Sequence, residues 1–365
     1  MMMGTILILA NSSSGLYGFR NELILELVKQ HSVHVSLPDD TNNRELLEEG
    51  CIIHHTDINR RGMNPIEDIS LYKEYRRLIA KIRPDVILTY TIKPNVYGGY
   101  AAARSKVPYI ANITGLGSAL EGGGILQKVA LMLYRVGLRR AQCVFWQNQS
   151  NFDFGKSHRM TKARCELLPG SGVNTGRFEV TKLPEDTMEF LFISRVMREK
   201  GIEEYLEMAR DVKKVHPEAV FKILGQCEED YTDILKSEEQ AGTIEYVGRV
   251  LDVRPYLKDA QAVIHPSFYP EGMSNVCLEA AASGRSVITT DRPGCRETVV
   301  PGETGYLVPI KDAKSLTEAV LKYIELSYDE RCQMGLNGRR YVEERFDRNI
   351  VVNKYITEIQ RSIRE

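Results

Sequence analysis

HPSFYPEGMSNVCLEAAASGRSVITT, residues 265–290, combines a loop, a helix and a strand in one short stretch. An apolar segment, 262–264, precedes it as a predicted strand, and the β-branched run 286–290 is a second. Between them Ser274 offers the side-chain oxygen of a helix N-cap, an alanine-rich helix follows, and Gly284 ends it. This succession predicts one repeat of an α/β fold with a parallel sheet.

The predicted start of this helix suits an anion with a polyhydroxylated group on either side. Unpaired backbone N–H groups and the positive end of the helix dipole point at the loop and favour a phosphate or diphosphate. Glu279 lies about 7 to 8 Å further along the helix axis, where its carboxylate can accept hydrogen bonds from a ribose. Glu271, before the helix, can hold a second polyhydroxylated group. The stretch therefore predicts a nucleotide-sugar site.

These residues resemble the signature of the retaining glycosyltransferases of family 4, which have the two-domain GT-B fold. The signature places two glutamates with seven residues between them in a pattern close to EG-x-P-x-x-x-LEA-x-A-x-G-x-PVI, and this chain reads EGMSNVCLEAAASGRSVI, with Ser274 and Ser286 where prolines are common. The resemblance implies that Glu271 contacts the donor sugar and Glu279 the ribose. Two glutamates at this spacing also occur by chance on a core helix and its loop. The predicted donor contacts at the helix start are Gly272, Met273, Ser274 and Asn275.

Length and composition describe a globular protein of two domains. The chain has 365 residues, 43% of them hydrophobic and 27% charged, which is too long for one ordinary core. A net charge of -1 argues against nucleic acid as the main partner. The opening MMMGTILILA has no basic region and reads as a buried strand, not as a signal peptide or membrane span. Seven scattered cysteines predict reduced thiols in the cytoplasm.

Strands and helices alternate along the whole chain, which predicts parallel sheets with helices on both faces. The resemblance implies two Rossmann-like, doubly wound domains facing a central cleft, with a C-terminal helix that crosses back to the first domain. We place an acceptor-binding domain at 1–175, a nucleotide-sugar donor-binding domain at 176–345 and the crossing helix at 346–365. The boundary follows from the glycine- and proline-rich segment PGSGVNTGRFEVTKLPED, residues 169–186.

Two cations follow the first predicted strand of the second domain. Arg195 and Lys200 occur in the order S-R-x-x-x-x-K-G, where they can balance the charge of a diphosphate as it grows on a leaving group. Taken alone, basic residues at a helix entry are usually solvated. The resemblance assigns both to the diphosphate, and Glu271, Lys200 and Arg195 are the predicted catalytic residues. It also assigns Val250 a contact with the base.

Loops after strands of the first domain supply one further candidate donor contact, Gly15, and the candidate acceptor-side residues. Gly15 belongs to the glycine-bearing turn NSSSGLYG between the first strand and a helix predicted from about Phe19, and the resemblance places this loop near the donor phosphates and the acceptor. An ordinary tight turn is the alternative. Loops after two further strands supply the remaining candidates, whose glycines can equally serve only mobility. They are Lys93, Asn95, Gly115 and Gly117.

The segment 125–140, ILQKVALMLYRVGLRR, predicts a basic amphipathic helix. Lys128, Arg135 and Arg139 fall on one side of it, and such a helix can lie on an anionic membrane surface. A buried helix with basic edges is the alternative. Bacterial enzymes of the resembling type extend glycans on a lipid carrier, which implies an acceptor linked to undecaprenyl diphosphate and a cytoplasmic protein held at the inner face of the membrane.

The predicted reaction needs no metal and no cofactor. The chain has no D-x-D motif that could hold a divalent cation on a diphosphate, so the cations and the helix start must carry that charge. The resemblance implies transfer of a hexose or N-acetylhexosamine from a UDP-sugar, with retention of configuration, in bacterial surface polysaccharide biosynthesis. The alternatives are a GT-B epimerase acting on a UDP-sugar and a non-catalytic nucleotide-sugar-binding protein.

Overall fold

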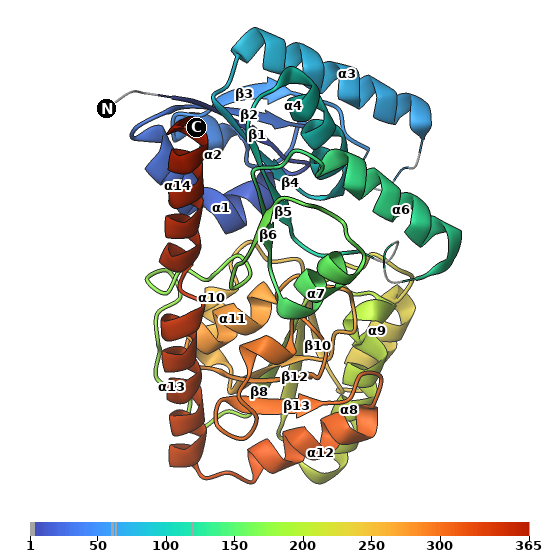
Figure 1. The fold of residues 1–365 in the computed structure, drawn as a ribbon. Helices are drawn as coiled ribbons and strands as arrows, with labels where there is room; N and C mark the ends of the chain where they lie inside the picture. Colours follow the sequence, from blue (N-terminus) through green and yellow to red (C-terminus); the bar gives the residue numbers. More distant parts are fainter. Residues whose placement is uncertain (1–3, 60–61, 63, 118–119, 121, 365) are drawn as a thin grey trace. The chain divides into compact units, whose positions relative to one another are not determined.

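The computed structural model describes residues 4–59, 62, 64–117, 120 and 122–364 (Figure 1). The chain divides into an N-terminal unit, residues 1–171 with 348–365, and a C-terminal unit, residues 172–347. The first boundary lies four residues before the expected one. Val173 N donates to the Phe346 carbonyl over 2.8 Å, and the Thr175 hydroxyl donates to Asp347 over 2.7 Å. These bonds join the first and last residues of the C-terminal unit to each other.

The N-terminal unit contains a parallel sheet in the order β3-β2-β1-β4-β5-β6-β7. This doubly wound order is typical of Rossmann-like domains. β7 was not predicted, because its sequence RCEL is half-exposed and lacks an apolar run. The strands are β1 Thr5–Leu9, β2 Ser32–Leu37, β3 Ile52–His55, β4 Val86–Tyr90, β5 Tyr109–Ile113, β6 Cys143–Trp146 and β7 Arg164–Leu167.

Helices cover both faces of this sheet (Figure 1). Ile6 and Ile8 of β1 pack with α1 and α14, whereas Leu7 and Leu9 pack with α3, α4 and α6. Successive residues of a strand point to opposite faces, so one apolar strand supplies both cores. The helical segments are α1 Ser13–Val28, α2 Asn43–Glu48, α3 Pro65–Ile82, the π-helix η1 Pro94–Gly98, α4 Gly99–Ser105, α6 Gly124–Gly137, α7 Gln149–Ser157 and α14 Arg348–Arg364.

The last helix packs on the first domain, as predicted from the resemblance. Val351, Val352 and Tyr355 of α14 are buried in the same cluster as residues of α1 and β4. The Asn112 amide of β5 donates to the Tyr355 hydroxyl, and Arg348 forms an ion pair with Glu22 of α1 over 2.8 Å. The N-terminal unit therefore depends on the end of the chain for part of its core.

The predicted turn around Gly15 is wrong, because α1 begins at Ser13. Ser12 is the N-cap, and its hydroxyl accepts a hydrogen bond from Gly15 N over 3.2 Å. The Asp40 carboxylate accepts from the Ser12 hydroxyl and from Ser13 N, over 2.9 and 3.1 Å. Gly15 is thus part of the first helical turn. The apolar periodicity missed this turn because its residues are small and polar and are held by the cap.

The C-terminal unit repeats the architecture with a parallel sheet in the order β10-β9-β8-β11-β12-β13. Its strands are β8 Glu189–Ile193, β9 Val220–Leu224, β10 Glu245–Gly248, β11 Ala262–His265, β12 Ser286–Thr290 and β13 Gly305–Val308. Its helices are the 3-10 helix η2 Arg198–Lys200, α8 Ile202–Val215, α9 Thr232–Gln240, α10 Arg254–Asp259, α11 Asn275–Ala282, the 3-10 helix η3 Arg296–Thr298, α12 Ala313–Ile324 and α13 Tyr328–Arg345.

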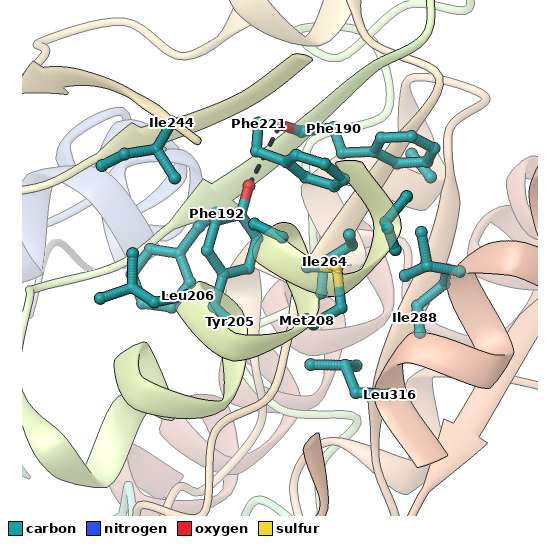
Figure 2. Close-up of a cluster of buried hydrophobic side chains, with 14 of the residues drawn as sticks. Phe190, Phe192, Tyr205, Leu206, Met208, Phe221, Ile244, Ile264, Ile288 and Leu316 are labelled. Atoms are coloured by element: carbon teal, nitrogen blue, oxygen red, sulfur yellow. Dashed lines mark hydrogen bonds between the residues drawn. The ribbon is translucent and has the colours of Figure 1, made fainter. Parts of the chain in front are cut away.

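An aromatic cluster fills one face of this second sheet (Figure 2). Phe190 and Phe192 of β8 and Phe221 of β9 pack against Tyr205 of α8. The Tyr205 hydroxyl donates to the Phe190 carbonyl over 3.3 Å, so the buried phenol has a partner. This packing fixes β8, whose carboxyl end leads to Arg195.

The strand order of the C-terminal unit reverses between β8 and β11. After β8 the chain adds β9 and β10 on one side, and it then returns to place β11 on the other side. In doubly wound sheets, ligands bind outside the carboxyl ends of the strands at such a reversal. The segments that leave β8 and β11 carry Arg195, Lys200 and Glu271.

Candidate functional site

The N-terminus of α11 is formed as the sequence predicts. Ser274 is the N-cap and its hydroxyl accepts a hydrogen bond from Cys277 N over 3.4 Å. Ser274 N in turn donates to the Gly294 carbonyl over 2.7 Å. A side chain at Gly294, which has a φ of +92°, would lie 3.1 Å from the Glu271 carbonyl. Asn275 begins the helix, and its buried Oδ1 has no hydrogen-bond partner among the described residues.

Glu271 lies at the centre of a small polar cluster. Its Oε1 forms an ion pair with Lys200 Nζ, accepts a hydrogen bond from the Ser267 hydroxyl over 3.2 Å, and lies 3.6 Å from His265 Nε2. The side chains of Lys200 and Glu271 are only 10% and 13% exposed.

The charges of this cluster fix the ionisation of Glu271. Burial alone would raise the pKa of the carboxyl, but the Lys200 ammonium and His265 hold it well below its usual range. A carboxyl that stays ionised at neutral pH cannot act as a general acid. It can accept hydrogen bonds from sugar hydroxyl groups, or stabilise positive charge that develops beside it.

Gly201 explains how Lys200 reaches this carboxylate. It ends the 3-10 helix with a φ of +77°, and a side chain there would lie 2.2 Å from the Pro266 carbonyl oxygen. Only glycine tolerates both the backbone angle and this close approach. Phe268 N donates to the Glu199 carbonyl over 2.9 Å, so the 3-10 helix is attached to the loop that contains Glu271.

Arg195 lies at the edge of the same cluster. Its Nη1 contacts Glu228 Oε2 at 2.7 Å, and its side chain is 39% exposed. The Arg195 guanidinium and the Lys200 ammonium lie 5.5 and 4.9 Å from the centre of the Tyr269 ring, within the range of cation–π attraction. A side chain at Gly225 would lie 1.6 Å from the Ser194 carbonyl, so this glycine lets the ends of β8 and β9 approach.

The structure pairs each predicted cation with a carboxylate, which the sequence did not predict. Arg195 contacts Glu228, and Lys200 contacts Glu271. A diphosphate that binds to either cation must therefore displace the carboxylate with which that cation is paired. Sequence reasoning assigned no part to Glu228, or to three residues of HPSFYPEG that touch the cluster: His265, Ser267 and Tyr269. Their place in the loop after β11 was the only available signal.

The other predicted donor contacts, apart from Gly15, also lie in the C-terminal unit. Gly272 and Met273 are buried between Glu271 and the cap, while Glu279 is half-buried on α11, between the buried Leu278 and Ala280. Val250 follows β10 and is half-buried against a cluster that includes Leu278. Gly15 lies in the N-terminal unit.

The four acceptor-side candidates differ in their exposure and in whether their polar groups already have partners. Lys93 forms an ion pair with Asp68 over 2.7 Å. Asn95 is 1% exposed, and its amide accepts from the Thr89 hydroxyl and donates to the Asn112 carbonyl over 2.7 and 2.8 Å. Asn95 thus connects β4 to β5 and is not exposed to a ligand in this structure. Gly115 and Gly117 are half-buried in the loop after β5, and Gly117 has a φ of +70°.

Comparison with known proteins assigns both halves of the chain to glycosyltransferases. The family model for glycosyl transferases group 1 matches residues 175–341, and the model for glycosyl transferase 4-like proteins matches residues 5–148. An N,N'-diacetylbacillosaminyl-diphospho-undecaprenol alpha-1,3-N-acetylgalactosaminyltransferase from Campylobacter jejuni is 24% identical over 98% of both chains. A capsular polysaccharide biosynthesis glycosyltransferase, CapM from Staphylococcus aureus, is 25% identical over 88% of both.

Solved structures share the whole fold. A glycosyltransferase from Rickettsia africae superimposes with a TM-score of 0.81 at 18% identity, covering 100% of this chain and 99% of its own. HepE from Anabaena, solved with UDP and glucose, has a TM-score of 0.79 at 17% identity and covers 98% and 100%. The chain therefore belongs to the glycosyltransferases of the family 4 type, with the two Rossmann-like domains of the GT-B fold.

Proposed function

We propose that the protein is a retaining, metal-independent glycosyltransferase that moves a hexose or N-acetylhexosamine from a UDP-sugar to a lipid-linked glycan during bacterial surface polysaccharide biosynthesis. The observation that carries the proposal is the largely buried Glu271, paired with Lys200 and ionised at neutral pH, next to the capped start of α11. The name of the Campylobacter relative supports a diphospho-undecaprenol acceptor, and the complex of HepE with UDP and glucose supports a UDP-sugar.

In the proposed complex the diphosphate lies at the start of α11, where backbone N–H groups and the helix dipole favour negative charge. Arg195 and Lys200 balance the charge that develops on the leaving group. Glu271 orients the sugar, Glu279 accepts hydrogen bonds from the ribose, and Val250 contacts the base. The acceptor hydroxyl attacks from the side of the leaving group, and a diphosphate oxygen takes its proton.

Metal independence is part of the proposal, because protein groups supply the positive charge. Across the described residues, no group of three or more His, Cys, Asp or Glu side chains is placed to hold a metal ion. We expect UDP to raise the melting temperature more than GDP or ADP, and we expect transfer to proceed unchanged in EDTA. Loss of transfer in EDTA that magnesium restores would contradict metal independence. UDP binding without transfer to any lipid-linked glycan would favour a binding protein, and donor consumption without acceptor an epimerase.

We further propose that α6 holds the protein at the cytoplasmic face of the membrane. Ile125, Val129, Met132 and Val136 recur at helical spacing and are 82%, 44%, 56% and 40% exposed. Lys128, Arg135 and Arg139 are exposed beside them. An exposed apolar stripe with basic neighbours is suited to an anionic bilayer surface. Among the described residues, no helix is both long and apolar enough to span a bilayer.

One detail of the predicted helix 125–140 is wrong, since α6 ends at Gly137 and Arg139 lies in the following turn. A side chain at Gly137 would lie 2.6 Å from both the Asn95 carbonyl oxygen and the Val96 Cα of η1, so α6 must end close to this neighbour. Glycine also lowers helix propensity by about 1 kcal/mol relative to alanine. The apolar stripe lies within the helix and is unaffected.

Exchanging two stripe residues for glutamate should remove membrane binding. We expect Val129→Glu/Met132→Glu to lower binding to vesicles that contain phosphatidylglycerol by at least about tenfold, because the change removes buried apolar contact and adds negative charge. Sedimentation with vesicles measures it. Leu336→Glu, on α13 in the C-terminal unit and 46% exposed, is the matched control and should bind as the unaltered protein does. Undiminished binding of the double variant would contradict a role for α6.

A further inference from the structure

We propose that His265 is a positioning residue. When Lys200 moves to the donor diphosphate, the His265 imidazole gains a proton and replaces Lys200 as the ion-pair partner of the Glu271 carboxylate. The inference rests on the proposed function, since it requires a nucleoside diphosphate at the start of α11. In this scheme the protein takes up one proton from solvent when the nucleotide binds, and the His265 imidazole binds that proton.

The geometry of the imidazole carries the proposal. His265 is 1% exposed, and neither ring nitrogen has a hydrogen-bond partner among the described residues. A buried polar group without a partner is destabilising, so such a side chain calls for an explanation. Its Nε2 lies 3.6 Å from Glu271 Oε1, just beyond hydrogen-bond distance. The backbone is fixed, because the Thr289 hydroxyl donates to the His265 carbonyl over 2.7 Å.

Glu271 needs a second positively charged partner because its carboxylate is buried and ionised. Lys200 and Glu271 form an ion pair with both side chains largely buried. If Lys200 turns to a diphosphate, a buried carboxylate is left without its counter-ion, which is strongly unfavourable. His265 can replace that counter-ion by moving less than about 1 Å to reach ordinary hydrogen-bond distance, and imidazole is the side chain that gains a proton near neutral pH.

The other titratable groups around the cluster cannot supply this charge. Burial and the negative charge of Glu271 together raise the pKa of the Cys277 thiol to about 11. Burial likewise raises the pKa of Cys295 well above its usual value. Both thiols therefore stay neutral. Lys200 and His265 are the two basic side chains whose distances to Glu271 the structure gives among the described residues.

Calorimetry measures the predicted proton directly. UDP is titrated into the protein at pH 8 in two buffers of different ionisation enthalpy, and the dependence of the binding enthalpy on the buffer gives the protons exchanged. We expect the unaltered protein to take up close to one proton more than His265→Gln. Because the ligand is the same in both titrations, the ionisation of UDP itself cancels. His216→Gln, which alters a half-buried histidine paired with Glu218, is the control and should match the unaltered protein.

The pH dependence of UDP affinity in the unaltered protein tests the proposal without a variant. Linked proton uptake makes the dissociation constant rise with pH, by up to about tenfold per unit between pH 7 and 9. Equal proton uptake by the unaltered protein and His265→Gln, or a dissociation constant that is flat over this range, would overturn the role of His265 and leave the proposed function intact. Failure of UDP and other nucleoside diphosphates to bind at all would overturn both.

Discussion

Replacing Glu271 with glutamine is expected to lower turnover by about 10² to 10³-fold and to leave UDP affinity unchanged or slightly tighter. Glutamine keeps the shape of the side chain and removes its charge. The sugar then loses an ionised acceptor that acts as positive charge develops on it. The affinity for UDP is not reduced, because in this variant Lys200 can bind the diphosphate without first leaving a carboxylate. Steady-state kinetics and UDP calorimetry separate the two effects.

Loss of a buried ion pair also lowers stability, so this substitution needs a matched control. Glu189 is 7% exposed and contacts Lys222 over 2.5 Å at the amino end of β8, in the same unit. Glu189→Gln therefore removes a second buried, lysine-paired carboxylate away from the site, one whose pKa burial raises. We expect both variants to melt at lower temperature, and only Glu271→Gln to lose turnover. A proportional loss of turnover and UDP affinity in Glu271→Gln would mean that Glu271 binds ground state and transition state alike.

The second large effect is expected at Arg285, where methionine should lower the free energy of unfolding by about 3–5 kcal/mol, because several buried carbonyl oxygens lose their hydrogen-bond donor. This guanidinium is fully buried, and its hydrogen-bond partners are carbonyl oxygens and one hydroxyl. It donates to the carbonyls of Thr181, Leu257, Lys258 and Ser283 over 2.7 to 3.2 Å. Arg285 thus joins the linker to the C-terminal ends of α10 and α11, whose dipoles favour a cation.

Urea denaturation followed by far-ultraviolet circular dichroism measures this loss. Arg285→Lys should give an intermediate value, because one ammonium cannot reach three separate segments as the guanidinium fork does. Arg296→Lys alters an arginine that is 42% exposed and paired with Asp291, and should change stability by less than about 1 kcal/mol. The single tryptophan, Trp146, lies in the N-terminal unit and reports the unfolding of that unit. A change below about 1 kcal/mol in Arg285→Met would contradict the role given to this residue.

The predictability of each part of the molecule depended on whether its signal was local. The strand 286–290 was predicted with its observed bounds, because a buried parallel strand is a continuous run rich in β-branched residues. The cap at Ser274 was found because its chemistry lies within a few residues. β7 and the first turn of α1 escaped, since a half-exposed edge strand and a serine-rich turn lack apolar periodicity.

By itself, the sequence determined the doubly wound α/β architecture, the capped helix and the residue types of a nucleotide-sugar site. These follow from periodicity, capping and spacing within single segments. Only the tertiary structure decided that Lys200 pairs with Glu271, that Arg195 pairs with Glu228, and that a buried His265 lies beside them. Arg195 and Glu228 are 33 positions apart in the sequence, and Lys200 and Glu271 are 71 positions apart. These contacts depend on which strand ends the fold brings together, and no local pattern encodes that distance.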